Sequence, residues 1–408
     1  MNRRLVIISV VAIACSRASG QMPGTVAVAN DPMLQHHEIR IDQLPKPFAT
    51  PSSGNPPSVG APPANATLHA PPGFHVSLFA DKLGDPRAML LAPNGDVILS
   101  EPGEGKITIL RDANHDGVAE QRFTFASGLD NPYGLAFHGK WLYVGNEGAV
   151  VRLPYAPGQT AANGKAEQIA ALPSGGHSTR GVLFNKAGTK MYVSIGSRSN
   201  VSSGEPPERA AIVEFNPDGS GKRIFAGGLR NPVGMAWEPA TKQLWTVVNE
   251  RDEMGGDLVP DYLTAVQFGG FYGWPYYYWG GYTDHRAPEP ERDLRQYTAR
   301  PDYALGAHVS ALGLSFAQGE KLGPQYADGA FVGLHGSWNR RPLSGYKVIF
   351  VPFEKGQPIG MPKDVLTGFL NKDEQAQGRP VGVAIDRQGA LLVADDVGNR
   401  IWRVTAQR

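Results

Sequence analysis

Cysteine, long apolar runs and an excess of charge of either sign are all scarce in this sequence. Cys15 is the one cysteine among 408 residues, which excludes an internal disulfide and a two-cysteine haem attachment motif. The formal net charge is +1, so nothing electrostatic favours nucleic acid or an anionic membrane as a partner. Almost no stretch repeats its apolar residues at helical spacing, so helices are not expected to build the fold.

A short pattern of small and apolar residues recurs instead. Its copies cover residues 86–92, 132–137, 180–184, 232–237, 311–316 and 380–385. Polar turn residues and a second apolar run follow each copy, and most units add a third run. Strand, turn and strand repeated at spacings of about 45–80 residues predicts an all-β six-bladed β-propeller. A pair of β-sandwiches is the alternative.

Two details of the repeats favour closure into a ring. A glycine stands in most copies of the first run, which suits an innermost strand where neighbouring backbones approach closely. Residues 74–80 form a strand-like run that precedes the first unit and has no partner of its own. We expect this run to join the last blade and tie the two ends of the chain together.

The N-terminal region reads as export and tether segments. Residues 1–20 have a positive head, a short apolar core and small residues at the end, as a signal peptide does. Cys15 loosely fits a lipoprotein signal, so the mature protein is expected in the periplasm, free or lipid-anchored, without a transmembrane helix after processing. The Pro-rich stretch 21–71 predicts an extended tether, and 72–408 the propeller.

His177 is the histidine best placed for chemistry. It lies just before the third repeat, where a propeller loop opens onto the central channel, and Arg180 follows it. A neutral imidazole there can take a proton from a substrate hydroxyl. The alternative is a loop histidine that bonds only backbone.

Arginines stand at equivalent places in later units. Arg230 with Asn231 opens the fourth unit, Arg340 follows the second strand of the fifth, and Arg379 opens the sixth. Converging loops would make a cationic bowl for a multiply anionic ligand, because guanidinium forks match carboxylates. Taken singly, each arginine is equally consistent with a solvated loop residue.

Three further stretches carry oxygen ligands or aromatic rings. Residues 249–262 are dense in carboxylates of the kind that calcium prefers. Residues 112–117 have calcium-loop spacing but lack the final glutamate, so an Asx turn explains them as well. The aromatic run 271–279 suits either a sugar site or local packing.

These residues together resemble the glucose/sorbosone dehydrogenase family, over roughly residues 72–404. The resemblance rests on the His177 loop, the segment 229–234, the loop 249–252 followed by 269–275, and the Arg379 segment. The sorbosone dehydrogenase branch is the more similar one, because 257–262 and 336–340 resemble it.

The resemblance implies a six-bladed propeller that carries pyrroloquinoline quinone and oxidises a sugar or an aldehyde. It implies His177 as general base and Arg230 as the group that stabilises negative charge. Further implied roles are a quinone contact for Asn231 and cofactor carboxylate contacts for Arg340 and Arg379. Arg180 is also expected to bind the cofactor. It also implies calcium held through backbone oxygens near Arg251 and Asp252, and an external electron acceptor such as a quinone, cytochrome or dye.

Some positions depart from the glucose-oxidising branch. Gly176 stands where an Asp is usual, Arg340 replaces a Lys, and the loop 130–132 lacks a Gln. Substrate identity is therefore open. Two rival functions remain at this stage: a calcium-dependent lactone hydrolase, and a binding propeller without catalysis.

Overall fold

The computed structural model describes residues 28–30, 39, 41–60, 68–290 and 292–406. The expected signal peptide and Cys15 lie outside this part of the chain. Helices in the described part are single turns of 3-10 type: η1 (Ile41–Gln43), η2 (Pro102–Glu104), η3 (Arg295–Tyr297), η4 (Glu320–Leu322) and η5 (Pro324–Tyr326). None of them is long and apolar enough to cross a bilayer.

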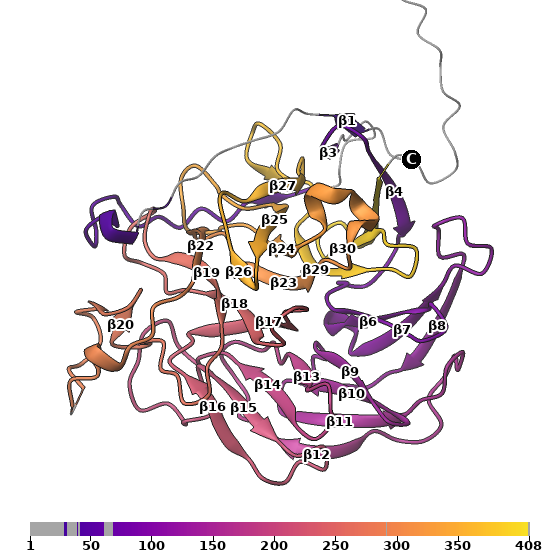
Figure 1. The fold of residues 1–408 in the computed structure, drawn as a ribbon, viewed down its shortest axis with the longest axis horizontal. Helices are drawn as coiled ribbons and strands as arrows, with labels where there is room; N and C mark the ends of the chain where they lie inside the picture. The colour runs from indigo at the N-terminus through magenta and orange to yellow at the C-terminus, as the bar shows by residue number, and fades with distance from the viewer. Residues whose placement is uncertain (1–27, 31–38, 40, 61–67, 291, 407–408) are drawn as a thin grey trace, which may run out of the picture.

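Six antiparallel sheets stand in a ring around a central axis, which confirms the six-bladed β-propeller (Figure 1). Blade 1 consists of β5 (Met89–Leu91), β6 (Val97–Glu101), β7 (Lys106–Arg111) and β8 (Gln121–Ala126). Blade 2 consists of β9 (Leu135–His138), β10 (Trp141–Asn146), β11 (Ala149–Pro154) and β12 (Glu167–Ala171). Blade 3 consists of β13 (Val182–Phe184), β14 (Met191–Ile195), β15 (Ala211–Phe215) and β16 (Arg223–Gly227).

The remaining blades follow the same order from the axis outward. Blade 4 consists of β17 (Asn231–Trp237), β18 (Leu244–Asn249), β19 (Pro260–Ala265) and β22 (Tyr303–Ala307). Blade 5 consists of β23 (Ala311–Phe316), β24 (Gly329–Leu334), β25 (Lys347–Glu354) and β27 (Lys363–Leu366), and β26 (Gln357–Pro358) also pairs with β25. Blade 6 consists of β29 (Pro380–Ile385), β30 (Leu391–Asp395), β31 (Arg400–Ala406) and β4 (Phe74–Ala80).

The strand β4 closes the ring, as the sequence predicts. It pairs antiparallel with β31, and Val76 lies opposite Val404. Blade 6 therefore takes its outermost strand from the start of the domain and the other three from its end. This exchange joins the termini without leaving an open sheet edge.

Glycines of the innermost strands let adjacent blades approach, which confirms their predicted position. A Cβ on Gly134 of blade 2 would lie 2.4 Å from the carbonyl oxygen of Arg180 in blade 3. A Cβ on Gly313 of blade 5 would lie 2.2 Å from the carbonyl oxygen of Val381 in blade 6. Any side chain there would push two blades apart.

Apolar residues fill the spaces between blades and the channel itself. Trp245 of blade 4 is fully buried and its ring meets Phe353 of blade 5 edge-on, with ring centroids 5.0 Å apart. In the channel, residues of the innermost strands and of the loops leading into them form one apolar cluster: Ala88, Tyr133, Val233, Leu312 and Val381. The axis of the ring is therefore filled by a packed apolar core.

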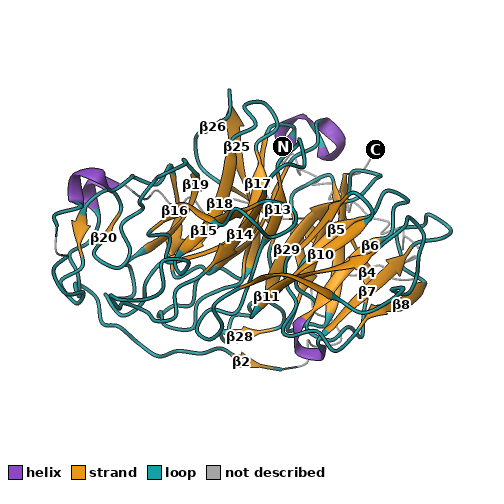
Figure 2. Ribbon diagram, turned by 90° about the horizontal axis from the view of Figure 1, so that it is seen from below, coloured by secondary structure: helices purple, strands orange, loops and turns teal. Residues whose placement is uncertain are grey.

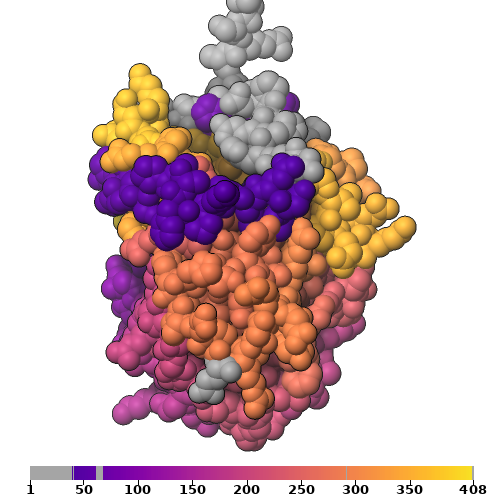
Figure 3. Space-filling view, turned by 90° about the vertical axis from the view of Figure 1, so that its left-hand side faces the viewer, coloured from indigo at the N-terminus to yellow at the C-terminus, as the bar shows by residue number. Residues whose placement is uncertain are grey.

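Residues 41–60, which we call the strap, run over the surface rather than forming a domain. The strap donates from Phe48 N to Met254 O at 2.7 Å and from Asn55 N to Trp338 O at 2.6 Å. It ends in β2 (Ser58–Val59), which pairs in parallel with β28 (Gln375–Ala376) at the lower edge of Figure 2. Figure 3 shows the strap in indigo, lying across the surface beside orange and yellow residues.

Four short strands complete the described structure. β1 (Val28–Asn30) pairs in parallel with β3 (Leu68–Ala70) beside blade 6. β20 (Tyr277–Tyr278) and β21 (Tyr282–Thr283) form a hairpin in the long connection between β19 and β22.

Candidate active site

One end of the ring gathers two sets of loops. One set leads into the innermost strands, and the other set follows the second strands. Since these strands are antiparallel neighbours, the start of the first lies beside the end of the second. The loops of all six blades therefore border the same mouth of the channel, above the apolar cluster.

His177 lies in this set of loops, between β12 and β13. Its Nδ1 is 2.7 Å from the carbonyl oxygen of Ser197, which follows β14. A carbonyl only accepts, so Nδ1 carries the hydrogen and Nε2 keeps its lone pair. Burial and the nearby charge of Arg230 lower the pKa of His177 to about 4, so the ring is neutral at pH 7.

Arg230 is held in place by partners on one side only. Nη1 donates to Glu250 O at 2.7 Å, and Nη2 donates to the Asp252 carboxylate at 3.0 Å. Its Nε is buried and has no hydrogen-bond partner in the described structure. The buried Oδ1 of Asn231 likewise has none.

Gly196 brings these side chains together. A Cβ at this position would lie 2.2 Å from Asn231 Oδ1 and 2.6 Å from His177 Cβ. Only a residue without a side chain lets His177 and Asn231 stand on either side of it. The structure therefore assembles His177, Arg230 and Asn231 at one point of the channel mouth, as the sequence analysis expects.

This arrangement fits the expected quinone cofactor. Buried polar groups are normally paired, so an unpaired guanidinium N–H on Arg230 and an unpaired amide oxygen on Asn231 indicate a polar ligand. The apolar cluster beneath suits a flat ring system. Arg230 offers a cation for an oxyanion or carboxylate, and His177 offers a neutral imidazole beside it.

Arg180 has a different place from the one expected. Its side chain is fully buried, and its guanidinium donates to the carbonyl oxygens of His177, Thr179 and Pro173 at 2.6, 2.8 and 2.7 Å. Burial lowers its pKa to about 10, and it stays charged at neutral pH. Arg180 thus supports the His177 loop from within, and a direct contact with a cofactor does not fit this geometry.

Arg340 and Arg379 bond mainly to backbone. Arg340 donates to Gly256 O and Asp257 at 2.8 Å each, which ties blade 5 to the loop after β18. Arg379 donates to His335 O at 2.9 Å and Gly336 O at 2.6 Å. Arg379 borders the channel mouth at the start of blade 6, whereas Arg340 braces two loops.

Of the backbone oxygens near Arg251 and Asp252 that were expected to hold calcium, that of Asp252 is already engaged by hydrogen-bond donors. The Arg251 side chain is fully buried, and it donates to Glu250, Asp284 and a backbone oxygen of the long connection between β19 and β22. The carbonyl oxygen of Asp252 accepts from Asn200 Nδ2 at 3.1 Å and from Arg286 Nη1 at 2.7 Å. A carbonyl bonded to a guanidinium does not fit a calcium ligand in this arrangement.

The other two stretches have structural roles. In the loop 112–117 the carboxylates of Asp112 and Asp116 accept backbone N–H groups of Asp116, Gly117 and Val118, as in Asx turns. The aromatic run 271–279 is mostly buried, and Trp274 donates from Nε1 to Asn200 O at 2.9 Å. These rings pack the connection between β19 and β22 against the Asp252 loop, and they do not form a surface for binding a sugar.

A family model described as TrAA12-like matches residues 68–260 and 288–407. The chain belongs to the TrAA12-like family. The expected kinship with quinone-dependent sugar dehydrogenases is thereby confirmed at the level of the family and its relatives.

Two curated relatives are dehydrogenases. A pyrroloquinoline quinone-dependent pyranose dehydrogenase of Coprinopsis cinerea is 24% identical over 409 residues, which covers 84% of this chain and 55% of that protein. An aldose sugar dehydrogenase of Escherichia coli is 26% identical over 182 residues, 41% of this chain and 47% of that protein. The matches span only about half the length of these two relatives.

A solved structure shares the fold. The Trichoderma reesei protein of carbohydrate-active enzyme family AA12 superimposes with a TM-score of 0.72 at 20% identity, covering 86% of this chain and all of that one. At this identity the likeness establishes the propeller fold and nothing more specific.

The TrAA12-like propeller also carries a polar cluster that the sequence analysis missed. His335 follows β24, and its Nε2 is 2.8 Å from the Asp396 carboxylate, which also accepts from Arg87 Nη2 at 2.8 Å. Burial lowers the pKa of His335 to about 4 against the opposing effect of Asp396. His335 and Asp396 each come directly after the second strand of a blade, and Ser197 comes one residue beyond that place in its own blade. This shared position is the sequence signal that could have identified His335 and Asp396.

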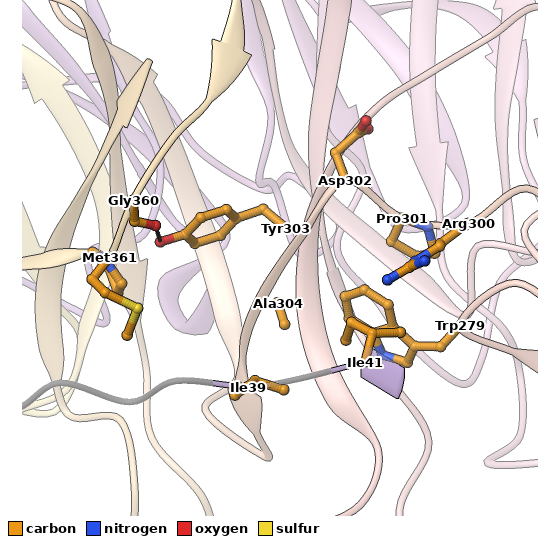
Figure 4. Close-up of a pocket in the computed structure, with 11 residues that line it drawn as sticks. Ile39, Ile41, Trp279, Arg300, Pro301, Asp302, Tyr303, Ala304, Gly360 and Met361 are labelled. Atoms are coloured by element: carbon orange, nitrogen blue, oxygen red, sulfur yellow. Dashed lines mark hydrogen bonds between the residues drawn. The ribbon is translucent and has the colours of Figure 1, made fainter. Parts of the chain in front are cut away.

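A separate cavity of about 440 Å³ lies beside β22, the outermost strand of blade 4, and Figure 4 shows residues that line it. Its lining includes Ile41, Trp279 and Tyr303. The Tyr303 hydroxyl donates to Gly360 O at 3.0 Å, and Asp302 accepts from Thr264 at 2.8 Å. Its polar groups serve the fold, so the cavity is not the candidate active site.

Proposed function

We propose that this protein is a pyrroloquinoline quinone-dependent dehydrogenase that oxidises a sugar or a related aldehyde. One observation carries the proposal: His177 is neutral, its Nδ1 is fixed by Ser197, and unpaired polar atoms of Arg230 and Asn231 lie beside it. The family and the printed activities of its two dehydrogenase relatives support it.

The residues have separable roles in this mechanism. Bound pyrroloquinoline quinone supplies a carbon that accepts hydride, so the two electrons of the substrate leave with that hydrogen. Nε2 of His177 accepts the hydroxyl proton of the substrate, because it holds the free lone pair of a ring that is neutral at pH 7. Arg230 would stabilise the negative charge that the bound acceptor gains when hydride leaves the substrate carbon.

The neighbouring residues keep these two groups ready. Asp252 and the Glu250 carbonyl hold two of the three guanidinium nitrogens of Arg230, and Nε is left without a hydrogen-bond partner in the described structure. Arg180 fixes the backbone on which His177 stands. Such preorganisation matters because small misplacements of a catalytic group cost large factors in rate. No step is assigned to calcium, since Asp252 O has donors already.

A lactone hydrolase has less support. That function needs several carboxylates converging on one channel ion. Within the described ranges, no group of three or more His, Cys, Asp or Glu side chains is arranged to hold a metal ion. A binding propeller without catalysis remains the rival that experiment must separate.

The test uses the mature protein with and without pyrroloquinoline quinone. We expect the quinone to raise the melting temperature, and the loaded protein to reduce an artificial dye in the presence of aldoses or aldehydes. His177→Gln should keep the thermal shift and lose dye reduction, while His285→Gln, at an exposed site, should keep both. A thermal shift without turnover on any sugar would favour the binding propeller.

We also propose export to the periplasm, with reoxidation there by a quinone or cytochrome. The signal-like residues 1–20 support export. Expression of the full chain followed by fractionation and intact mass tests this directly. Cleavage before Gln21 indicates a soluble product, and a diacylglyceryl mass on Cys15 indicates an anchor. An uncleaved chain in the cytoplasm would contradict export.

A further inference from the structure

Two segments outside the family match converge on the loop that follows β18. These segments are the strap and residues 261–287, which we call the insertion. From the strap, Ser52 Oγ accepts the N–H of Gly255 at 3.0 Å. From the insertion, Arg286 reaches the carbonyl oxygen of Asp252. Both segments that the family match leaves out therefore contact the loop expected to hold calcium.

Arg286 is fixed rigidly where it meets this loop. Its Nε and Nη2 form a bidentate pair with the two oxygens of Asp284, at 2.9 and 2.8 Å. The same carboxylate accepts from the buried Arg251 at 3.3 Å. A planar guanidinium held by two such bonds has one direction left for Nη1, and Nη1 points to Asp252 O at 2.7 Å.

Every oxygen of Asp252 is thereby engaged. Its carbonyl oxygen has two lone pairs, which meet Arg286 Nη1 and Asn200 Nδ2. Its carboxylate oxygens accept from Arg230 Nη2 at 3.0 Å and Asn339 Nδ2 at 2.8 Å. A calcium ion on the carbonyl oxygen would have to displace a fixed cation and then stand beside it. Both the lost bond and the like charge disfavour that exchange.

We propose that Arg286 supplies at Asp252 the positive charge that a calcium ion was expected to supply, so the site binds its ligand without a divalent metal. The proposal depends on the proposed function only for the identity of the ligand. Arg286 is a positioning residue here, because it acts through the Asp252 loop.

The experiment measures the affinity of the mature protein for pyrroloquinoline quinone by quenching of tryptophan fluorescence, in EGTA and in calcium. Wild type should bind equally well in both. Arg286→Gln should bind about tenfold more weakly in EGTA, the loss expected for one charge-assisted hydrogen bond, and regain affinity in calcium. Arg286→Lys keeps the charge but loses the bidentate pair with Asp284, so its affinity in EGTA should fall between those of wild type and Arg286→Gln. Arg295→Gln, at an exposed arginine, should change nothing.

Other results overturn the proposal. The proposal is contradicted if the wild-type protein needs calcium to bind the quinone. It is also contradicted if Arg286→Gln binds the quinone in EGTA as tightly as wild type does. If neither wild type nor any variant binds the quinone, the result refutes the proposed function and not the proposal about Arg286.

In that case calorimetric titration with calcium alone tests the proposal about Arg286. The titration uses an Asp112→Asn background, which removes the loop 112–117 as a competing calcium site. Calcium binding only after Arg286→Gln supports the proposal, and binding with Arg286 intact, or in neither protein, overturns it.

Discussion

Nδ1 of His177 donates to the carbonyl oxygen of Ser197 over 2.7 Å, across the 20 residues that separate them in the chain. This bond fixes the tautomer of the imidazole, because a carbonyl oxygen has no hydrogen to give. It also joins the loop before β13 to the end of β14. The base therefore takes its orientation from the blade itself.

Replacement of His177 by Gln should lower kcat by about two to four orders of magnitude, the usual contribution of a general base. Gln keeps a donor for Ser197 O but offers no basic nitrogen. Steady-state kinetics with a dye acceptor measures the loss, and the melting temperature checks the fold. Activity within a factor of a few of wild type would refute the assignment.

Arg180→Ala should destabilise the fold and slow turnover together. The change leaves the carbonyl oxygens of His177, Thr179 and Pro173 without their donor, and each unpaired buried group costs about 1–3 kcal/mol. Urea unfolding should show a loss of about 3 kcal/mol or more, as for other broken buried charge networks. Arg122→Ala, at an exposed site, is the matched control. Unchanged stability would contradict the supporting role.

Gly313→Ala should weaken the packing between blades 5 and 6. The added Cβ would lie 2.2 Å from Val381 O, and the neighbour is backbone that cannot move alone. We expect a loss of about 1–3 kcal/mol, typical of overpacking, in urea unfolding. Gly54→Ala meets no atom within 4 Å and should be nearly neutral. Equal stability of the two variants would argue against tight contact at the axis.

His335 should make the protein less stable in mild acid. Burial lowers its folded pKa to about 4, below the ordinary 6.5. The unfolded chain therefore takes up a proton first, so stability present above pH 6.5 is lost as pH falls toward 4. From pH 7 to pH 5 the expected loss at this site is about 2 kcal/mol.

The comparison that isolates this site is His335→Gln against wild type, by urea unfolding at both pH values. Asp395, whose pKa burial raises to about 6, acts in the opposite direction in both proteins and cancels. The variant should lose about 2 kcal/mol less than wild type over this range. An identical pH dependence in the two proteins would mean that folding does not shift the pKa of His335.

Much of the fold could be predicted from the sequence because the patterns that indicate it are local and repeated. Alternating apolar runs, turn residues and a glycine at the same place in most units indicate a strand order that every blade shares. The closing strand was predictable for the same reason, since residues 74–80 had strand character and no partner nearby. His177, Arg230 and Asn231 stood at positions that a ring of repeats brings to one end.

The failures concern what side chains do after the chain has folded. Arg180 stands next to His177 in sequence, yet its long side chain turns inward and pairs with carbonyl oxygens. The Asp252 loop had the oxygen atoms that calcium prefers, but the donor that takes its carbonyl comes from Arg286, more than thirty residues later. His335 and Asp396 are 61 residues apart and meet only across two blades.

The sequence by itself determined that this chain forms blades, how many, and which loops meet at the channel mouth, since each follows from periodicity along the backbone. Only the tertiary structure decided which nitrogen of His177 is free, and which arginines face a ligand and which serve the fold. Those outcomes depend on distances between blades and on the competition of hydrogen-bond donors for each carbonyl oxygen. Neither can be predicted from the spacing of residues along the chain.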